Sequence, residues 1–345
     1  RSRGLGDVYK SQVLAGSCRI IWDKTTGMLS GWETDDRPLL TGDGLRLNVF
    51  RAPTDNDAHS PYMQQPINWL SCGLDALEDS GSAWLDAQDA ETVTIRSTRR
   101  YIGKRDCGFD HDCRYRVFAD GTVELTNTVR PFGELPLLPR IGVMLTMPSA
   151  FERFCWYGLG DMETYPDRRS CGRIGCWESS VTDLLDTTYE KPQECGSHEA
   201  VQLLGLFDVD DHGLSVIPLG NCAATAQHYT PQQLARAAHL CELRPDDATY
   251  VYLDAAQIGL GNRSCGPEPL PPYRLKPEER TFAFVLRPTG RAGWLDTRRL
   301  RYGNPQPDTT PNTQQTAASA PETAPADSYV DPSDPDARRK AGFQA

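Results

Sequence analysis

Apolar and polar side chains alternate along the middle of the chain in the manner of half-buried strands. In residues 123–129 the apolar side chains fall on one face of an extended segment and the charged and hydroxyl side chains on the other. The Asp-Gly pair at 120–121 favours a tight turn, so residues 112–129 are predicted to form a β-hairpin. Residues 19–32 predict a second hairpin, in which Gly27 supplies the positive φ of the turn.

The same strand and turn pattern recurs elsewhere, whereas helical patterns are few. Residues 201–207 and 214–219 predict two strands around a polar turn. Helices are predicted at 66–77 and at 231–240, where Thr230 can act as the N-cap. Strands do not alternate with helices and no fixed-length repeat is present, so the pattern predicts an all-β fold, a large antiparallel β-sandwich.

The two ends of the chain differ from its middle. Residues 1–11 carry no hydrophobic period, and we interpret them as a non-native or linker segment. The segment 304–345 holds seven of the 26 prolines among runs of Thr, Gln, Ser and Ala, a composition that cannot bury enough apolar surface to fold. We therefore expect a sandwich domain over 12–303, followed by a disordered tail.

Composition narrows the classes of partner and location. The net charge of -11 argues against nucleic acid, because binding to a phosphate backbone needs clustered Lys and Arg. No apolar stretch is long enough to predict a membrane span, so we expect a cytoplasmic protein. The 11 cysteines contain no CxxC pair, so no metal is expected, and scattered thiols are typical of a reducing compartment. A disulfide between Cys107 and Cys113 stays open as an alternative.

One polar segment follows a predicted strand at 50–57. It contains Arg51, Asp55, Asn56 and Asp57 within seven positions. Oxygen ligands of this kind suit a hard cation or sugar hydroxyls. The alternative is a structural loop in which the carboxylates accept backbone N–H bonds or pair with Arg51.

A second polar segment, 156–169, is the densest mixture of aromatic and charged residues. Its candidate residues are Glu163, Tyr165, Asp167 and Arg168. Rings beside carboxylates and a guanidinium suit carbohydrate contact, and paired carboxylates also serve glycoside hydrolysis. Nothing in the sequence marks Glu163 and Asp167 as such a pair, and a loop in which Asp167 and Arg168 hold neighbouring strands together explains the same residues.

A third segment, 259–267, is rich in glycine and ends in Ser264, Cys265 and Gly266. It lacks the Lys-Ser or Lys-Thr of a phosphate loop, so phosphate binding is rejected. Cys265 can act as a nucleophile only with a base beside it, and neither His228 nor His239 can be placed there. The alternative is an exposed loop with a small buried thiol.

A fourth segment, 192–198, contains His198, which can titrate near neutrality but is more often structural when it stands alone.

Taken together and in order, these four segments resemble the C-terminal domain of the large β-galactosidases of glycoside hydrolase family two, which also occurs as the small subunit of two-chain β-galactosidases. Residues 22–32 and 228–230 match as well, and the resemblance covers about 13–287. It implies a β-supersandwich related to aldose mutarotases. It also implies that the catalytic glutamates and the magnesium ligands lie in a (β/α)8 barrel domain outside this chain, so no residue here is expected to be catalytic and no cofactor is expected in this chain.

The resemblance places Ser264, Cys265 and Gly266 at the edge of the sugar site, where some members carry a tryptophan in the position of Cys265. The other matching positions are expected to form structural or sugar-contact loops: Arg51, Asp55, Asn56, Asp57, Glu163, Tyr165, Asp167, Arg168, Gln193, Glu194 and His198.

The implied function is a share in the hydrolysis of terminal β-D-galactosides such as lactose. The expected partners are a catalytic barrel domain or large subunit and the galactoside, within an oligomeric enzyme. The isolated chain is expected to be inactive. Two alternatives stay open. One is a carbohydrate-binding module, and the other is a mutarotase-like enzyme, which requires a histidine base paired with a carboxylate.

Overall fold

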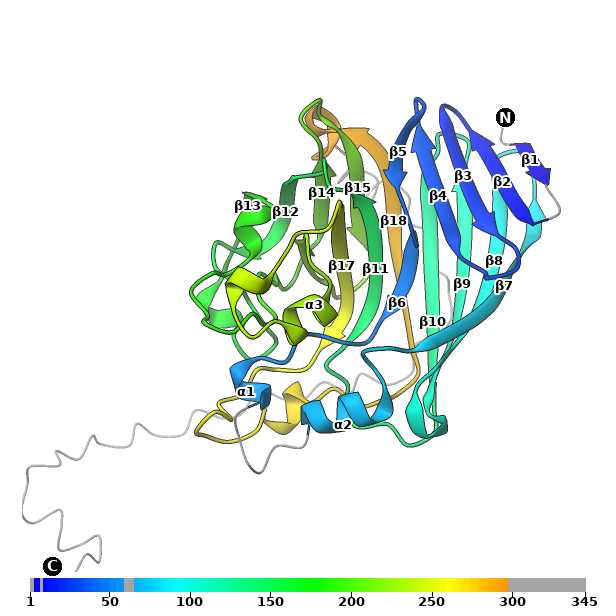
Figure 1. Cartoon of the computed structure of the whole chain (residues 1–345). Helices are drawn as coiled ribbons and strands as arrows, with labels where there is room; N and C mark the ends of the chain where they lie inside the picture. The colour runs from blue at the N-terminus through cyan, green and yellow to red at the C-terminus, as the bar shows by residue number, and fades with distance from the viewer. Residues whose placement is uncertain (1–2, 7–8, 59–64, 297–345) are drawn as a thin grey trace, which may run out of the picture. The chain divides into compact units, whose positions relative to one another are not determined.

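The computed structural model describes residues 3–6, 9–58 and 65–296. The strands of these residues form three antiparallel sheets (Figure 1). The nine-stranded sheet runs in the spatial order β13 (Arg173–Ser180), β12 (Arg153–Gly160), β14 (Leu203–Phe207), β15 (His212–Pro218), β18 (Arg280–Gly290), β10 (Val123–Phe132), β9 (Gly108–Phe118), β8 (Thr92–Ile102) and β7 (Glu78–Gln88). The five-stranded sheet runs β1 (Arg3–Gly6), β2 (Lys10–Ala15), β3 (Cys18–Asp23), β4 (Leu29–Thr34) and β5 (Arg37–Leu40). The four-stranded sheet runs β16 (Ala223–Gln227), β17 (Ala248–Gln257), β11 (Arg140–Pro148) and β6 (Leu45–Asn48).

Short helices lie in the loops at the ends of these sheets. The α-helices are α1 (Asp55–Ala58), α2 (Gln65–Cys72) and α3 (Pro231–Arg236). Single 3-10 turns lie at Lys104–Asp106, Arg169–Cys171, Thr182–Leu184, Leu240–Glu242, Pro271–Tyr273 and Arg291–Gly293. The predicted all-β class and antiparallel sandwich are confirmed.

The two smaller sheets pack side by side on the large one (Figure 1). Under the five-stranded sheet, the rings of Trp22 on β3 and Tyr115 on β9 meet edge to face with centroids 5.3 Å apart. Under the four-stranded sheet, Val251 and Leu253 of β17 belong to the same core as Phe154 of β12. The core is thus continuous across both halves, and burial of these apolar side chains is the main force that holds the sheets together.

Both predicted hairpins are present. Strands β3 and β4 pair around Gly27, and β9 and β10 pair with Val117 opposite Val123. Gly121 has a φ of +84°, and a Cβ there would lie 2.3 Å from the Cys18 sulfur, so this turn accepts only glycine.

Both predicted helices are shorter than the hydrophobic pattern indicates. The helix expected at 66–77 ends at Cys72, because the Leu74 and Gly73 amides return to the Trp69 and Leu70 carbonyls and close the last turn. The helix expected at 231–240 ends at Arg236. Thr230 is its N-cap, as predicted, and the Gln233 side chain completes a capping box with it.

The N-terminal segment differs from the expectation. Residues 1–11 were predicted to stand outside the fold, but Arg3–Gly6 pairs with β2, and β2 itself begins at Lys10. The pairing satisfies the backbone hydrogen-bonding groups of β2 on that side. Backbone pairing of this kind does not require a hydrophobic period in the added strand. The non-native origin of this segment and the 12–303 boundary stay predictions. The predicted tail, 304–345, lies outside the described residues.

All 11 cysteines are free, so the disulfide between Cys107 and Cys113, which was left open as an alternative, is absent. Within the described ranges, no helix is long and apolar enough to cross a membrane.

Candidate functional site

The segment 50–57 is organised by a buried ion pair. Arg51 is 0% exposed and donates through Nη2 to Oδ1 of Asp57 at 2.9 Å and through Nε to Oδ2 at 3.1 Å. The Thr54 amide donates to the same carboxylate at 3.0 Å. Arg51 also donates to the Ile258 carbonyl at 3.1 Å, immediately before the glycine-rich loop. The pairing of Arg51 with a carboxylate, the structural alternative for this segment, is present and ties two motifs together.

Two side chains from different motifs hold the glycine-rich loop. Asp167 accepts the Leu260 and Gly261 amides at 2.9 and 2.7 Å. Asn56 donates to the Gly261 carbonyl at 2.7 Å and accepts from the Ser264 hydroxyl at 2.8 Å. The loop lacks regular structure of its own, so these bonds fix its path.

Cys265 stands at the outer end of this loop and is exposed, so the alternative of a buried thiol is wrong. The loop turns outward because Asn56 and Asp167 bind its backbone on the inner side. In the described part of the chain no hydrogen bond joins Cys265 to a histidine: His228 contacts Glu152, and His239 contacts Glu242. Nothing therefore activates this thiol as a nucleophile.

A cavity of about 560 Å³ lies beside the loop, lined by side chains of three motifs: Asn56, Asp167, Arg168, Asn262 and Glu268 are among them. The structure thus brings the segments 50–57, 156–169 and 259–267 to one place.

Replacing Asp167 by asparagine tests the support of this loop. The amide retains one acceptor for two backbone donors, so we expect faster hydrogen exchange at Leu260 and Gly261 and a loss of about 1 to 2 kcal/mol of unfolding free energy. The Thr122 amide, which Asp120 holds in another turn, serves as the internal control. Unchanged exchange at Leu260 and Gly261 would contradict the supporting role.

Glu163 occupies a second set of contacts on the 156–169 segment. Its carboxylate accepts from the Gly196 amide at 3.0 Å and pairs with Arg168 at 3.2 Å, and Tyr165 donates to it at 3.4 Å. Burial raises the pKa of this carboxyl. Glu163 and Asp167 each bind separate backbone amides, so the structure gives no support to a catalytic pair.

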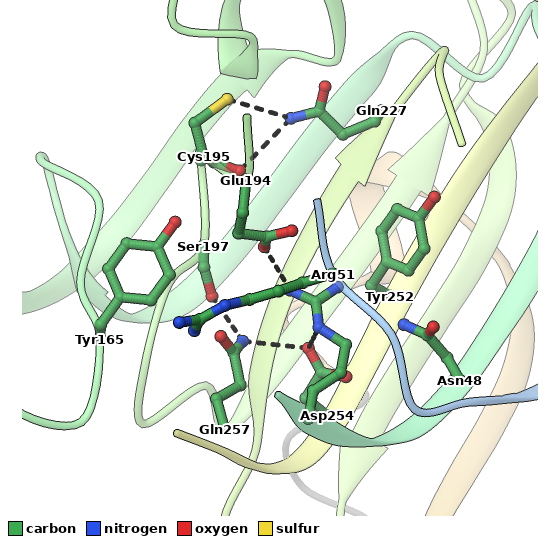
Figure 2. A network of polar contacts seen from close by, with 12 residues as sticks. Asn48, Arg51, Tyr165, Glu194, Cys195, Ser197, Gln227, Tyr252, Asp254 and Gln257 are labelled. Atoms are coloured by element: carbon green, nitrogen blue, oxygen red, sulfur yellow. Dashed lines mark hydrogen bonds and ion pairs between the residues drawn. The ribbon is translucent and has the colours of Figure 1, made fainter. Parts of the chain in front are cut away.

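The segment 192–198 takes part in a buried network of polar contacts, seen in Figure 2. Gln193 accepts the Asp55 amide at 2.6 Å, and Glu194 forms an ion pair with the fully buried Arg140. Gln257 donates to Ser197 at 2.9 Å and to Asp254 at 3.0 Å (Figure 2). These contacts join the 192–198 loop to the polar face of the four-stranded sheet.

Asp254 is the second carboxylate beside Arg140, with Oδ2 3.6 Å from Nε. Burial raises the pKa of Asp254 to about 7, against the opposing effect of Arg140. Arg140 and Asp254 were not among the site residues predicted from the sequence. The available signal was a charged residue next to a run of apolar residues: Arg140 begins β11, and Asp254 follows Val251 and Leu253 in β17.

His198 is buried against the Trp156 ring, with centroids 4.0 Å apart and the planes inclined by 24°. Burial lowers its pKa to about 4. Burial thus disfavours titration near neutrality, and the ring contact with Trp156 favours the structural alternative.

A buried Cys113, His111 and Asn127 set was also missed. The His111 Nε2 lies 3.1 Å from the Cys113 sulfur and 3.0 Å from the Asn127 Oδ1. Burial raises the pKa of Cys113 to about 12 and lowers that of His111 to about 4. Both shifts oppose a thiolate and imidazolium pair, so this set packs the core and does not act as a nucleophile.

Glu199 gives a pH prediction. Burial raises its pKa to about 7, so the folded protein holds a proton that the unfolded chain has released above its ordinary value of 4.5. The protonated Glu199 side chain therefore contributes fully to folding stability at acid pH, and this contribution declines as the pH rises toward 7. We expect E199Q to gain stability relative to the parent protein between about pH 4.5 and pH 8, by at most about 3 kcal/mol and less where solvent screens the group. Urea unfolding at several pH values measures this, with E91Q as the exposed control. A constant difference between E199Q and the parent protein would contradict it.

Across the residues that the structure describes, no group of three or more His, Cys, Asp or Glu side chains is arranged to hold a metal ion.

The fold and these loops define an antiparallel β-sandwich domain in which four sequence segments are joined by buried polar contacts. Residues 15–286 match the family model described as beta galactosidase small chain, and the chain belongs to this family, as the resemblance indicated.

Similar relatives bear the name beta-galactosidase. The protein from an Arthrobacter species is 30% identical over 275 residues, which cover 71% of this chain and 26% of the relative. The protein from Staphylococcus xylosus is 31% identical over 246 residues, or 70% of this chain and 24% of the relative. The chain thus spans about a quarter of the length of these relatives. A solved galactose 1-epimerase from Lactobacillus acidophilus is similar with a TM-score of 0.47 and 10% identity, covering 84% of this chain and 99% of that one.

Proposed function

We propose that the chain is the C-terminal domain or small subunit of a β-galactosidase and completes the edge of its galactoside site. The observation that carries the proposal is the family match over 15–286 together with relatives in which the matched region makes up 26% and 24% of the length. The rest of such an enzyme supplies the barrel domain with the catalytic glutamates and the magnesium ion. The substrates are terminal β-D-galactosides such as lactose.

The geometry of the glycine-rich loop supports the role at the site edge. Asn56 and Asp167 fix the loop from the inner side and leave Cys265 outward, where it can face a second domain. A thiol cannot stack on a sugar ring as a tryptophan does, so the proposed outer subsite binds the substrate through smaller contacts. A cytoplasmic location and an oligomeric complete enzyme belong to the same proposal.

Complementation tests this function. The purified chain is mixed with the barrel-bearing part of a related β-galactosidase that lacks its own C-terminal quarter, and association and lactose hydrolysis are measured. We expect no hydrolysis by either part alone and hydrolysis by the complex. A Cys265→Trp variant is expected to lower KM for lactose by adding a stacking surface. Hydrolysis by the isolated chain, or no association with the barrel-bearing part, would refute the proposal.

A further inference from the structure

The four-stranded sheet has one apolar face and one polar face. Leu45 of β6, Val143 and Leu145 of β11, and Val251 and Leu253 of β17 point into the core. Because successive side chains of a strand alternate between faces, their neighbours point the other way. Apart from Gly142 and Met144 of β11, these neighbours are polar: Arg46, Asn48, Thr146, Tyr250, Tyr252 and Asp254. The outer face of a sandwich sheet is ordinarily polar. Here that face is partly covered by other segments of the chain, which leave a cavity over it.

A cavity of about 740 Å³ lies over the open half of this polar face. Its floor comes from β6, β11 and β17, and its walls come from residues 74–77 and from the start of α3 at 230–232. The other half of the face is closed by the contacts of Glu194 and Gln257 described above. This volume is in the range of small-molecule sites.

Asn48, at the end of β6 in the floor of the cavity, has an unused hydrogen-bond donor. The residue is 8% exposed, and its Oδ1 accepts the Phe50 amide at 3.4 Å, which directs the Nδ2 group away from that strand. In the described residues Nδ2 has no hydrogen-bond partner, and neither has the buried Oδ1 of Asp75, another lining residue. Figure 2 draws Asn48 with no dashed line to the residues of the polar network. A buried donor without a partner is unfavourable unless a ligand or water supplies the acceptor.

The lining selects a neutral ligand with many hydroxyl groups. The lining contains the carboxylates of Asp43, Asp75, Asp246 and Asp247 and one guanidinium, that of Arg46, which already pairs with Asp43 and Asp79. This balance disfavours an anion. A cation carries no acceptor for the Asn48 amide. The apolar side chains of the wall, among them those of Phe50, Leu74 and Leu77, offer contact for C–H groups. A sugar ring combines hydroxyl donors, hydroxyl acceptors and C–H faces.

We propose that this cavity is a saccharide-binding site of the chain itself, with Asn48 donating to a sugar hydroxyl and the Asp75 and Asp247 carboxylates accepting from others. The site uses none of the residues of the glycine-rich loop. It does not rest on the proposed function, because it needs no barrel domain.

The test is titration of the 345-residue chain with galactose, glucose and lactose, followed by calorimetry and by the NMR signals of the Asn48 side-chain amide. We expect binding of at least one of these sugars and movement of that amide signal. Asn48→Leu removes the donor, and Ala76→Trp fills the cavity from an exposed position in its wall. Each is expected to weaken binding at least about tenfold, the effect of about 1.4 kcal/mol.

Ala238→Trp is the matched control, since Ala238 is exposed and lies outside the cavity lining, and it should bind as the parent chain does. Thermal unfolding of each variant shows whether it is folded, and Ala76→Trp keeps the test valid if Asn48→Leu does not fold. The proposal is overturned if none of the three sugars binds, if methylammonium or phosphate binds in their place, or if Ala76→Trp binds sugar as tightly as Ala238→Trp. Loss of complementation with a barrel domain would leave this result unaffected, so the two proposals fail separately.

Discussion

Replacing Arg140 by leucine is expected to lower the free energy of unfolding by about 3 to 5 kcal/mol. The guanidinium is completely buried between the carboxylates of Glu194 and Asp254, whose side chains are 5% and 0% exposed. Leucine fills part of the space but leaves two buried carboxylates without a cation. Because Arg140 opposes the upward pKa shift of Asp254, its removal raises that pKa further. The loss should therefore be larger at about pH 7 than at about pH 5, where a proton can neutralise Asp254.

Urea unfolding followed by tryptophan fluorescence measures this effect, with Arg130→Leu as the matched control. Arg130 also pairs with an aspartate, Asp112, at 2.5 Å, but the two side chains are 46% and 42% exposed. An exposed pair contributes less than about 1 kcal/mol, because water solvates both charges when the pair is broken. Equal small losses in the two variants would show that the buried ion pairs do not stabilise the fold.

Replacing Gly44 by alanine is expected to lower the free energy of unfolding by more than about 4 kcal/mol. A loss of this size is typical of severe backbone or packing conflicts. Gly44 connects β5 to β6 with a φ of +57°, and a Cβ there would lie 1.6 Å from the Leu29 carbonyl oxygen of β4. The obstacle is backbone, so no side-chain rotation relieves it. Gly44 also accepts the Thr146 amide at 2.9 Å, so a shift of the turn would disturb β11.

Gly220→Ala is the control for this substitution. Its Cβ would meet no atom within 4 Å, and its φ lies outside the left-handed region. Since alanine restricts the unfolded chain more than glycine does, we expect no loss and a gain of up to about 1 kcal/mol. Circular dichroism during heating compares both variants with the parent protein. A Gly44→Ala protein with an unchanged melting temperature would contradict the close approach to β4.

The local parts of this fold can be predicted from the sequence because their causes are local. Alternation and the Asp120-Gly121 turn determine the β9 and β10 hairpin, and Thr230 with Gln233 determines the start of α3. Helix ends were less predictable. The end of α2 depends on backbone bonds at Gly73 and Leu74, whereas the hydrophobic pattern continues to Leu77.

The candidate site could be predicted only in part, since its contacts join distant positions. The residues that match the family are close together, but what joins them is Arg51 with Ile258, Asn56 with Gly261, and Arg140 with Glu194. No spacing along the chain encodes these pairs. Likewise Asn127 lies on the apolar face of β10, where its amide binds His111, and a hydrophobic pattern alone assigns that position to a nonpolar side chain.

The composition of the four-stranded sheet has a consequence for how the chain reaches this structure. Strand β6 ends at Asn48, but its neighbour β11 begins at Arg140, and β11 in turn pairs with β17, which ends at Gln257. Closing such long intervening loops is slow, because their entropy is lost before the contacts form. During synthesis, β6 must therefore wait for β11, which begins at Arg140, and the sheet is extended further only when β17, which begins at Ala248, has been made. Over that interval the nascent chain exposes a surface that a chaperone can bind.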